Sequence, residues 1–240
     1  MILFVIEKLI TTLFISGTMN NEEVISKTID FVKSELEGET TGHDWFHSER
    51  VWKIALRLAK EENADLFIVQ MAALLHDVDD WKFNGGKDDS NEDKLNSWLS
   101  KVNVSEEESK QIIRIINGLA FKGEGHSSAM EAKEGMVVQD ADRLDALGAI
   151  GIARAFASGQ MFGQMLYDPS IKPLTGATKE EYKKQYTGER KNTTVNHFYE
   201  KLLLLKDLMN TETAKKMAEE RTSYMEGFLK QFFEEWDVKD

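Results

Sequence analysis

Proline is almost absent from this chain. The 240 residues include two prolines, Pro169 and Pro173, which stand close together. Proline removes a backbone donor and clashes with the preceding helical turn, so its scarcity leaves long stretches in which nothing breaks a helix. We find no convincing alternation of apolar and polar residues that predicts a sheet, and no glycine-rich phosphate loop between a strand and a helix. The sequence therefore predicts an all-α fold.

Composition narrows the classes of function. With 41% hydrophobic residues the chain can bury a sizeable core, and its length suits one large domain or two small ones. Thirty basic residues against 42 acidic ones give a formal net charge of −12, which argues against binding to a nucleic-acid polymer or an anionic membrane. The absence of cysteine excludes disulfides, thiolate zinc clusters and a catalytic thiol. A reducing compartment, the cytoplasm, is expected.

The first 16 residues are strongly apolar. Glu7 and Lys8 interrupt this stretch, no basic segment precedes it, and it falls short of the ~20 residues that a spanning helix needs. We interpret residues 1–18 as an apolar N-terminal extension, and residues 19–240 as a single domain. A docking helix, a start upstream of Met19 and a weak membrane anchor are the alternatives for the extension; stable membrane insertion is not expected.

Helical periodicity and end signals divide the rest of the chain. Gly38 ends a first helix, Asp65 is an expected N-cap, and Ser105 with Glu108 forms a capping box. We expect helices over residues 22–35, from near His47 through 51–58, and over 66–75, 91–101, 105–119, 136–158, 194–209 and 211–236. Segments 83–91 and 123–127 are expected to be loops.

Histidine and aspartate stand at three places against these helices. His47 opens the second helix, His76 and Asp77 end the third, and Asp142 lies in the helix predicted over 136–158. Taken singly, such residues are more often ordinary hydrogen-bonded side chains than ligands. Together they offer four nitrogen or oxygen ligands, which suit Mn, Fe, Co, Ni or Zn and leave positions on an octahedral ion for water and a substrate oxygen. The chemistry predicted is that of an open, hydrolytic metal site.

The local sequence around these residues resembles a known family. Residues 47–51 (HSERV), 74–77 (LLHD) and 140–144 (DADRL) resemble, in order, the three signatures of the HD-domain metal phosphohydrolases. Three further segments are similar to a bacterial subgroup that includes a manganese-dependent nucleoside-triphosphate pyrophosphohydrolase: 42–45, 145–151 and 196–202. The resemblance extends from about residue 19 to residue 236.

This resemblance implies an HD-domain helical bundle in which His47, His76, Asp77 and Asp142 bind one divalent ion. Manganese is the first expectation, with Co, Ni, Fe, Mg or Zn as alternatives. Asp140 and Asp142 are two residues apart, about 200° around a helix, so only one of them can face the ion. The signature favours Asp142, which leaves Asp140 as a helix cap or a partner of a ligand, although the reverse assignment stays open.

Catalytic roles follow partly from the family. Related HD hydrolases carry an acidic residue four positions after the second histidine that orients or deprotonates the attacking water, and here Asp80 stands there, with Asp79 as the alternative. Aspartate replaces the glutamate often found, so the base assignment stays open. Arg50, one turn after His47, is expected to hold a ligand carboxylate, unless it forms an ordinary ion pair.

Substrate contacts are expected from five further residues. Lys82 and Lys122 adjoin aromatic residues in predicted loops and are expected to bind phosphate, with solvated surface charge as the alternative. His126 is either a mobile proton donor or an ordinary loop residue. His43 and Asp44 precede His47 by one turn, where they can contact the substrate or support the ligand; Asp44 can equally be only the N-cap.

The expected reaction is metal-dependent hydrolysis of a phosphoester or phosphoanhydride in a nucleotide. The resemblance favours cleavage of (deoxy)nucleoside triphosphates to monophosphate and pyrophosphate. Alternatives are a phosphomonoesterase, a cyclic phosphodiesterase and a regulatory module whose metal site is not catalytic. A diiron oxygenase needs additional ligands that we do not find. The expected partner is a small phosphorylated molecule, and a homodimer is compatible with the sequence.

Overall fold

The computed structural model describes residues 19–39, 42–78, 92–119, 130–174 and 190–239. Within these ranges it contains nine α-helices and one 3₁₀-helix, and the β-structure there is limited to an isolated bridge between Met165 and Thr193. The predicted all-α fold is confirmed. The proposed division at residue 18 falls outside the described residues and stays a prediction.

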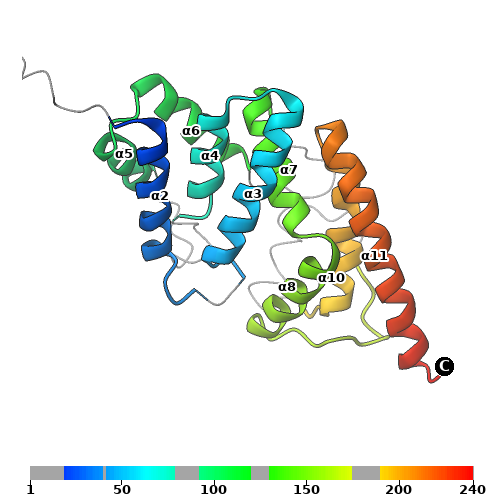
Figure 1. The fold of residues 1–240 in the computed structure, drawn as a ribbon. Helices are drawn as coiled ribbons and strands as arrows, with labels where there is room; N and C mark the ends of the chain where they lie inside the picture. Colours follow the sequence, from blue (N-terminus) through cyan, green and yellow to red (C-terminus); the bar gives the residue numbers. More distant parts are fainter. Residues whose placement is uncertain (1–18, 40–41, 79–91, 120–129, 175–189, 240) are drawn as a thin grey trace, which may run out of the picture.

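The helices form two groups, one on each side of a central pair made by α3 and α7 (Figure 1). Helix α3 packs most extensively against α7 and α4, with α2, α5 and α6 beyond α4 and with α8, α10 and α11 on the other side. The bounds are α2 Asn21–Glu35, α3 Trp45–Glu62, α4 Leu66–Leu75, α5 Glu92–Lys101, α6 Glu106–Gly118, α7 Lys133–Asp145, α8 Gly148–Met161, α10 Thr194–Glu200, η1 Leu202–Leu208 and α11 Glu212–Trp236.

Several helix ends lie where the sequence predicts them. Asp65 accepts hydrogen bonds from the first backbone N–H groups of α4, and Ser105 and Glu108 form the expected capping box at the start of α6. Gly38 follows α2 with a positive φ of 83°, a conformation that glycine adopts without steric cost. These ends are predictable because each cap involves residues within one turn of one another.

The single helix predicted over 136–158 is wrong. The chain forms α7 and α8 there, separated by a turn at residues 146–147, and Gly148 has a φ of 72°. A left-handed residue cannot continue a right-handed helix, so the chain changes direction at this point. As a consequence, Asp142 and Asp145 lie in the last turn of α7 rather than in the middle of a long helix.

The helix predicted over 194–209 is also wrong. Lys201 interrupts it with φ −143° and ψ −58°, and the second part continues as the 3₁₀-helix η1. The last helix, expected over 211–236, is confirmed as α11. Among the described helices, none combines the length and apolar character needed to cross a bilayer.

Helix α4 forms the centre of the core. Eight of its ten residues are buried: Phe67, Ile68, Val69, Met71, Ala72, Ala73, Leu74 and Leu75. A helix that is apolar on all sides is stable only when other helices surround it, and α2, α3, α6 and α7 pack around α4. The residues directly after Leu75 are therefore held inside the molecule, which is where His76 and Asp77 stand.

Candidate active site

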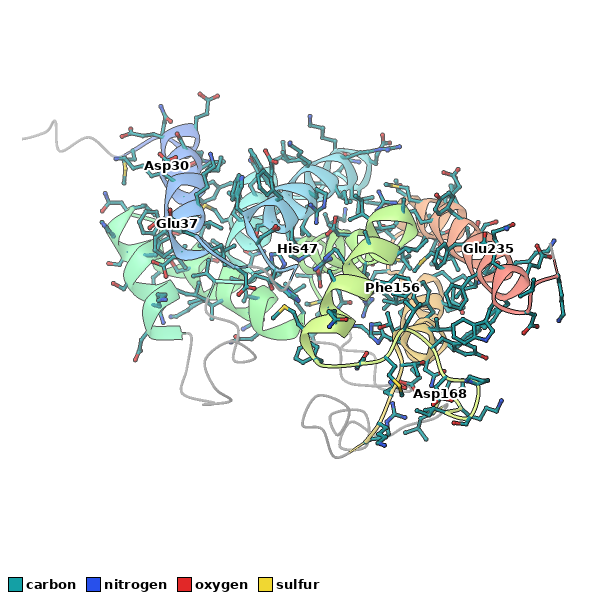
Figure 2. All side chains as sticks on the ribbon, turned by 90° about the horizontal axis from the view of Figure 1, so that it is seen from below. Asp30, Glu37, His47, Phe156, Asp168 and Glu235 are labelled. Atoms are coloured by element: carbon teal, nitrogen blue, oxygen red, sulfur yellow. The ribbon has the colours of Figure 1, made fainter. Side chains whose placement is uncertain are left out.

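Three helix ends converge in the interior of the molecule. His47 lies in the first turn of α3, His76 and Asp77 directly follow α4, and Asp142 lies in the last turn of α7. Figure 2 places His47 centrally, between the two groups of helices. The His47 side chain is fully buried, whereas the Asp142 side chain is 35% exposed. The cluster is thus closed on the His47 side and open to solvent on the Asp142 side.

The distances within this cluster suit one divalent ion. His47 Nε2 lies 3.2 Å from His76 Nε2, 3.2 Å from Asp77 Oδ2 and 3.5 Å from Asp142 Oδ1. His76 Nε2 lies 3.4 Å from Asp77 Oδ2 and 3.9 Å from Asp142 Oδ1. Ligand atoms bonded to one ion at ~2.1 Å are separated by about 3.0 Å at right angles and about 3.4 Å at tetrahedral angles. Each of these distances suits ligands of one ion, and the potential ligands whose atoms all lie near one another form two groups that share His47: His47, His76 and Asp142, and His43, His47 and Asp77.

The charges of the cluster also favour a cation. Burial alone lowers the pKa of His47, but hydrogen bonds with Asp142, Asp145 and Asp77 outweigh it and raise this pKa to about 10. Burial disfavours the charged form of Asp77 as well, yet the nearby His76 and His43 keep its pKa well below the usual range. The carboxylates thus remain ionised and stabilise positive charge at His47 Nε2. A divalent cation supplies that charge.

Asp145 fixes the orientation of His47 from behind. Its Oδ2 accepts a 2.7 Å hydrogen bond from His47 Nδ1, and its two oxygens also accept from Arg50 Nε at 2.7 Å, Arg50 Nη2 at 3.0 Å and Arg154 Nη1 at 2.9 Å. Burial opposes ionisation of Asp145, but the bonds from His47 and Arg50 lower its pKa to about 2. Because Nδ1 keeps its proton in this bond, Nε2 is the atom that would bind a metal ion, and the ion would displace the second proton that the raised pKa retains there.

These contacts refine the sequence predictions. The carboxylate that Arg50 holds is Asp145, which is not one of the four predicted ligands. The sequence analysis did not assign this role to Asp145, and it missed Arg154. A carboxylate three residues after a ligand carboxylate was the available signal for Asp145; no local signal pointed to Arg154.

His76 has a similar arrangement. Its Nδ1 donates a 2.8 Å hydrogen bond to the carbonyl oxygen of Ala73, one turn earlier in α4. This bond leaves Nε2 facing His47 Nε2 as the nitrogen that would bind the ion. Both imidazoles of the cluster are therefore oriented by a partner on the opposite ring nitrogen.

His43 and Asp44 lie beside the cluster. His43 Nδ1 is 2.9 Å from Asp77 Oδ2, and His43 with His47 and Asp77 forms a second group of potential ligands. The His43 side chain is 28% exposed, so it lies on the open side of the site. Asp44 is the N-cap of α3, where Oδ1 accepts the backbone N–H of His47. Contacts of either residue with a substrate stay predictions.

Asp140 occupies a different place from Asp142. It is fully buried, and its oxygens accept hydrogen bonds from the backbone N–H groups and side chains of Asn210 and Thr211. Burial raises the pKa of Asp140, although these hydrogen bonds act in the opposite direction. Asp140 thus joins α7 to the start of α11, and the structure brings Asp142 rather than Asp140 to the histidines.

Five predicted site residues lie outside the described residues. Their catalytic and phosphate-binding roles stay predictions: Asp79, Asp80, Lys82, Lys122 and His126.

Comparisons with known proteins agree with this geometry. Residues 45–147, the stretch that contains all four candidate ligands, match the HD domain. The chain is 39% identical to YpgQ of Bacillus subtilis over 209 residues, which is 84% of this chain and 88% of YpgQ. The chain belongs to the HD-domain family. The match to a crystal structure of YpgQ in complex with ADP covers 88% of this chain and 97% of the YpgQ chain, with 34% identity and a TM-score of 0.67.

Two further relatives have known structures. A protein from Lactobacillus plantarum with a known crystal structure is 39% identical in sequence; the match covers 92% of this chain and 100% of that chain, with a TM-score of 0.78. An HD-superfamily hydrolase from Bacillus thuringiensis is 44% identical and covers 91% of this chain and 99% of its own, with a TM-score of 0.69. These matches support a place for the chain among the HD-superfamily hydrolases.

Proposed function

We propose that this HD-domain protein is a metal-dependent phosphohydrolase that cleaves nucleoside triphosphates to monophosphate and pyrophosphate. The observation that carries the proposal is the convergence of two imidazole nitrogens and two carboxylates at the spacing of ligands around one ion. The complex of the related YpgQ with ADP supports a nucleotide as the class of substrate. Manganese is the proposed ion, on the resemblance to the manganese-dependent subgroup.

The four residues of the cluster have distinct tasks in this proposal. His47 and His76 hold the ion through Nε2, and Asp77 and Asp142 offset its charge. A divalent ion held there would supply Lewis-acid chemistry, activating water and offsetting the negative charge of a phosphoryl group. Asp142, the most exposed of the four, marks the side from which the substrate enters. The closed side, at His47, excludes water from the back of the site.

Residues around the cluster complete the mechanism. Asp145, held by Arg50 and Arg154, keeps a proton on Nδ1 of His47, so that Nε2 is the atom that would bind the metal ion. We assign Asp80, with Asp79 as the alternative, to orient the attacking water and accept its proton. Lys82 and Lys122 are proposed to bind the outer phosphates, because ammonium groups can offset charge that this acidic chain otherwise repels.

Product analysis of the full chain tests the function. The protein is stripped of metal with a chelator, supplied separately with Mn, Co, Ni, Fe, Mg or Zn, and incubated with a nucleotide panel. We expect pyrophosphate and a monophosphate from triphosphates, identified by mass. Asp77→Ala is expected to abolish turnover and weaken metal binding. Glu61→Gln removes an exposed carboxylate near the end of α3 and is expected to leave both unchanged.

Two results would contradict the proposal at different levels. Full activity of Asp77→Ala would remove the metal mechanism. Inorganic phosphate as the sole product, with pyrophosphatase contamination excluded, would replace the pyrophosphohydrolase by a phosphatase and leave the metal hydrolase in place.

A further inference from the structure

A pocket between α3 and α11 lies apart from the candidate metal centre. It has a volume of about 430 Å³ and opens between the later turns of α3 and the first turns of α11. The orange start of α11 lies near the cyan end of α3 in Figure 1. The residues that line it are Arg57, Thr213, Lys216, Met217, Glu220 and Arg221. Pockets of about 300–1,000 Å³ are typical of small-molecule sites, so this one exceeds what a single monatomic ion needs.

Positive charge dominates this pocket. Three of its six lining residues are basic and one is acidic, whereas the whole chain carries a formal net charge of −12. Arg57 and Lys216 are exposed, and in the described parts of the chain neither forms a hydrogen bond or an ion pair. The side chains of Arg57 and Lys216 are therefore open to solvent or to a ligand, with Glu212 also close enough to interact with the charge of Lys216.

Arg57 and Arg221 also act on each other. Arg221 is half-buried, and burial lowers its pKa; the charge of Asp145 opposes this shift, and the charge of Arg57 adds a smaller effect that lowers the pKa further. Two guanidinium groups that repel each other are stabilised by an anion placed between them. Guanidinium groups match phosphate oxygens in geometry, and Lys216 adds a third cation. A diphosphate group carries enough negative charge to pair with all three cations.

Arg221 connects this pocket to the metal-binding end of α7. Its Nη1 donates a hydrogen bond to the carbonyl oxygen of Leu144, which stands between Asp142 and Asp145 in the last turn of that helix. The stem of Arg221 also packs on Gly148, where an added Cβ would lie 3.2 Å from Arg221 Cγ. One side chain therefore touches both the pocket and the turn that follows the two aspartates.

We propose that the pocket between α3 and α11 binds a small diphosphate-bearing anion, and that Arg221 transmits this binding to the end of α7. The site is separate from the candidate metal centre, because none of its lining residues belongs to that cluster. Binding itself needs neither metal nor turnover, so the proposal stands or falls independently of the proposed function. Its consequence for the protein is a regulatory input to the helix end that carries Asp142.

Calorimetric titration with inorganic pyrophosphate tests the binding site. The full chain is used after metal removal, so that no ion at the metal centre can hold a phosphate. We expect one equivalent to bind, and Arg57→Gln and Lys216→Gln each to weaken it about tenfold or more through loss of a charge-assisted contact. Arg114→Gln, which removes an exposed arginine on α6, is the matched control and is expected to bind as the unsubstituted protein does.

Two outcomes overturn the binding site. One is the absence of pyrophosphate binding by the unsubstituted chain. The other is equal affinity in Arg57→Gln, Lys216→Gln and Arg114→Gln, which would show that the anion binds elsewhere. Circular dichroism of each variant confirms folding, and both pocket substitutions are at exposed side chains that leave the core intact.

Amide hydrogen exchange tests the connection to α7. In the metal-free chain, pyrophosphate is expected to slow exchange in segment 143–148, and Arg57→Gln is expected to abolish this protection at the same ligand concentration. Pyrophosphate bound at the pocket without any change in segment 143–148 would overturn the link through Arg221.

Discussion

Asp145→Asn is the substitution that most sharply tests how the site is built. The carboxylate accepts four hydrogen bonds: Oδ2 accepts from His47, Arg50 and Arg154, and Oδ1 accepts from Arg50 Nε. Asparagine keeps the shape but replaces one oxygen by an NH₂ group. Since donors face both oxygens, each orientation of the amide sets at least one N–H group against another. The substitution therefore removes a charge and also leaves a buried donor unsatisfied.

The expected loss follows from these contacts. Substituting a partner of a metal ligand costs 10–100-fold in metal affinity as a rule, which corresponds to about 1.4–2.7 kcal/mol. We expect the upper end, about 100-fold for Mn, because His47 loses the acceptor that holds its proton on Nδ1. The pKa of Asp145 is about 2, against 3.8 ordinarily, so its ionisation contributes about 2 kcal/mol to stability above pH 4. That contribution is lost as the pH falls through 4 towards 2, and Asp145→Asn lacks it at every pH.

Calorimetric titration of the metal-stripped chain with Mn measures the affinity, and thermal unfolding between pH 3 and pH 7 measures the stability. Asp168→Asn is the control, because its carboxylate also accepts two hydrogen bonds, both from Ser170, and is not part of the metal-binding cluster. A folded Asp145→Asn protein with a dissociation constant within threefold of the unsubstituted one would refute the argument that Asp145 orients His47.

Three further predictions follow from other parts of the structure. Since the pKa of His47 is raised to about 10, its imidazole carries two protons at pH 7, and Mn binding is expected to release about one proton per ion. Calorimetric titrations in buffers of different ionisation enthalpy measure the number of protons released, and a release of zero would contradict the prediction. Asp140→Ala is expected to destabilise the fold by about 2–4 kcal/mol in urea titrations, because it leaves the donors of buried Thr211 and the backbone N–H of half-buried Asn210 unsatisfied; a change below 0.5 kcal/mol would be inconsistent with this role. Asp80→Asn is expected to lower kcat by about 10²–10⁴-fold at similar KM, and an unchanged kcat would transfer the base role to Asp79.

The sequence by itself determined most of the helices. Periodicity and caps located α2, α4, α6 and α11 because each signal lies within a few residues of the chain, as with Asp65 at the start of α4. The same local rules predicted one helix where the chain forms α7 and α8, and one helix where it forms α10 and η1. Nothing in the neighbouring residues reveals that Gly148 and Lys201 leave the right-handed helical conformation, because packing against other helices decides those turns.

The candidate ligands were also visible in the sequence, as three ordered segments similar to the HD signatures. The choice between Asp140 and Asp142 required the rotation of α7 about its axis, which depends on how its buried face packs against α3 and α4. That rotation directs Asp142 to the histidines and Asp140 to the start of α11.

Only the tertiary structure decided what surrounds the ligands. Asp145 receives Arg50 from α3 and Arg154 from α8, and the pocket between α3 and α11 combines Arg57 with Arg221 across more than 160 residues of sequence. Helical periodicity tells which side chains share a face of one helix, but it carries no information about which faces meet. The distances between α3, α7, α8 and α11 are set by the volumes of the side chains packed between them, and contacts across those helices arise only when the whole core has formed.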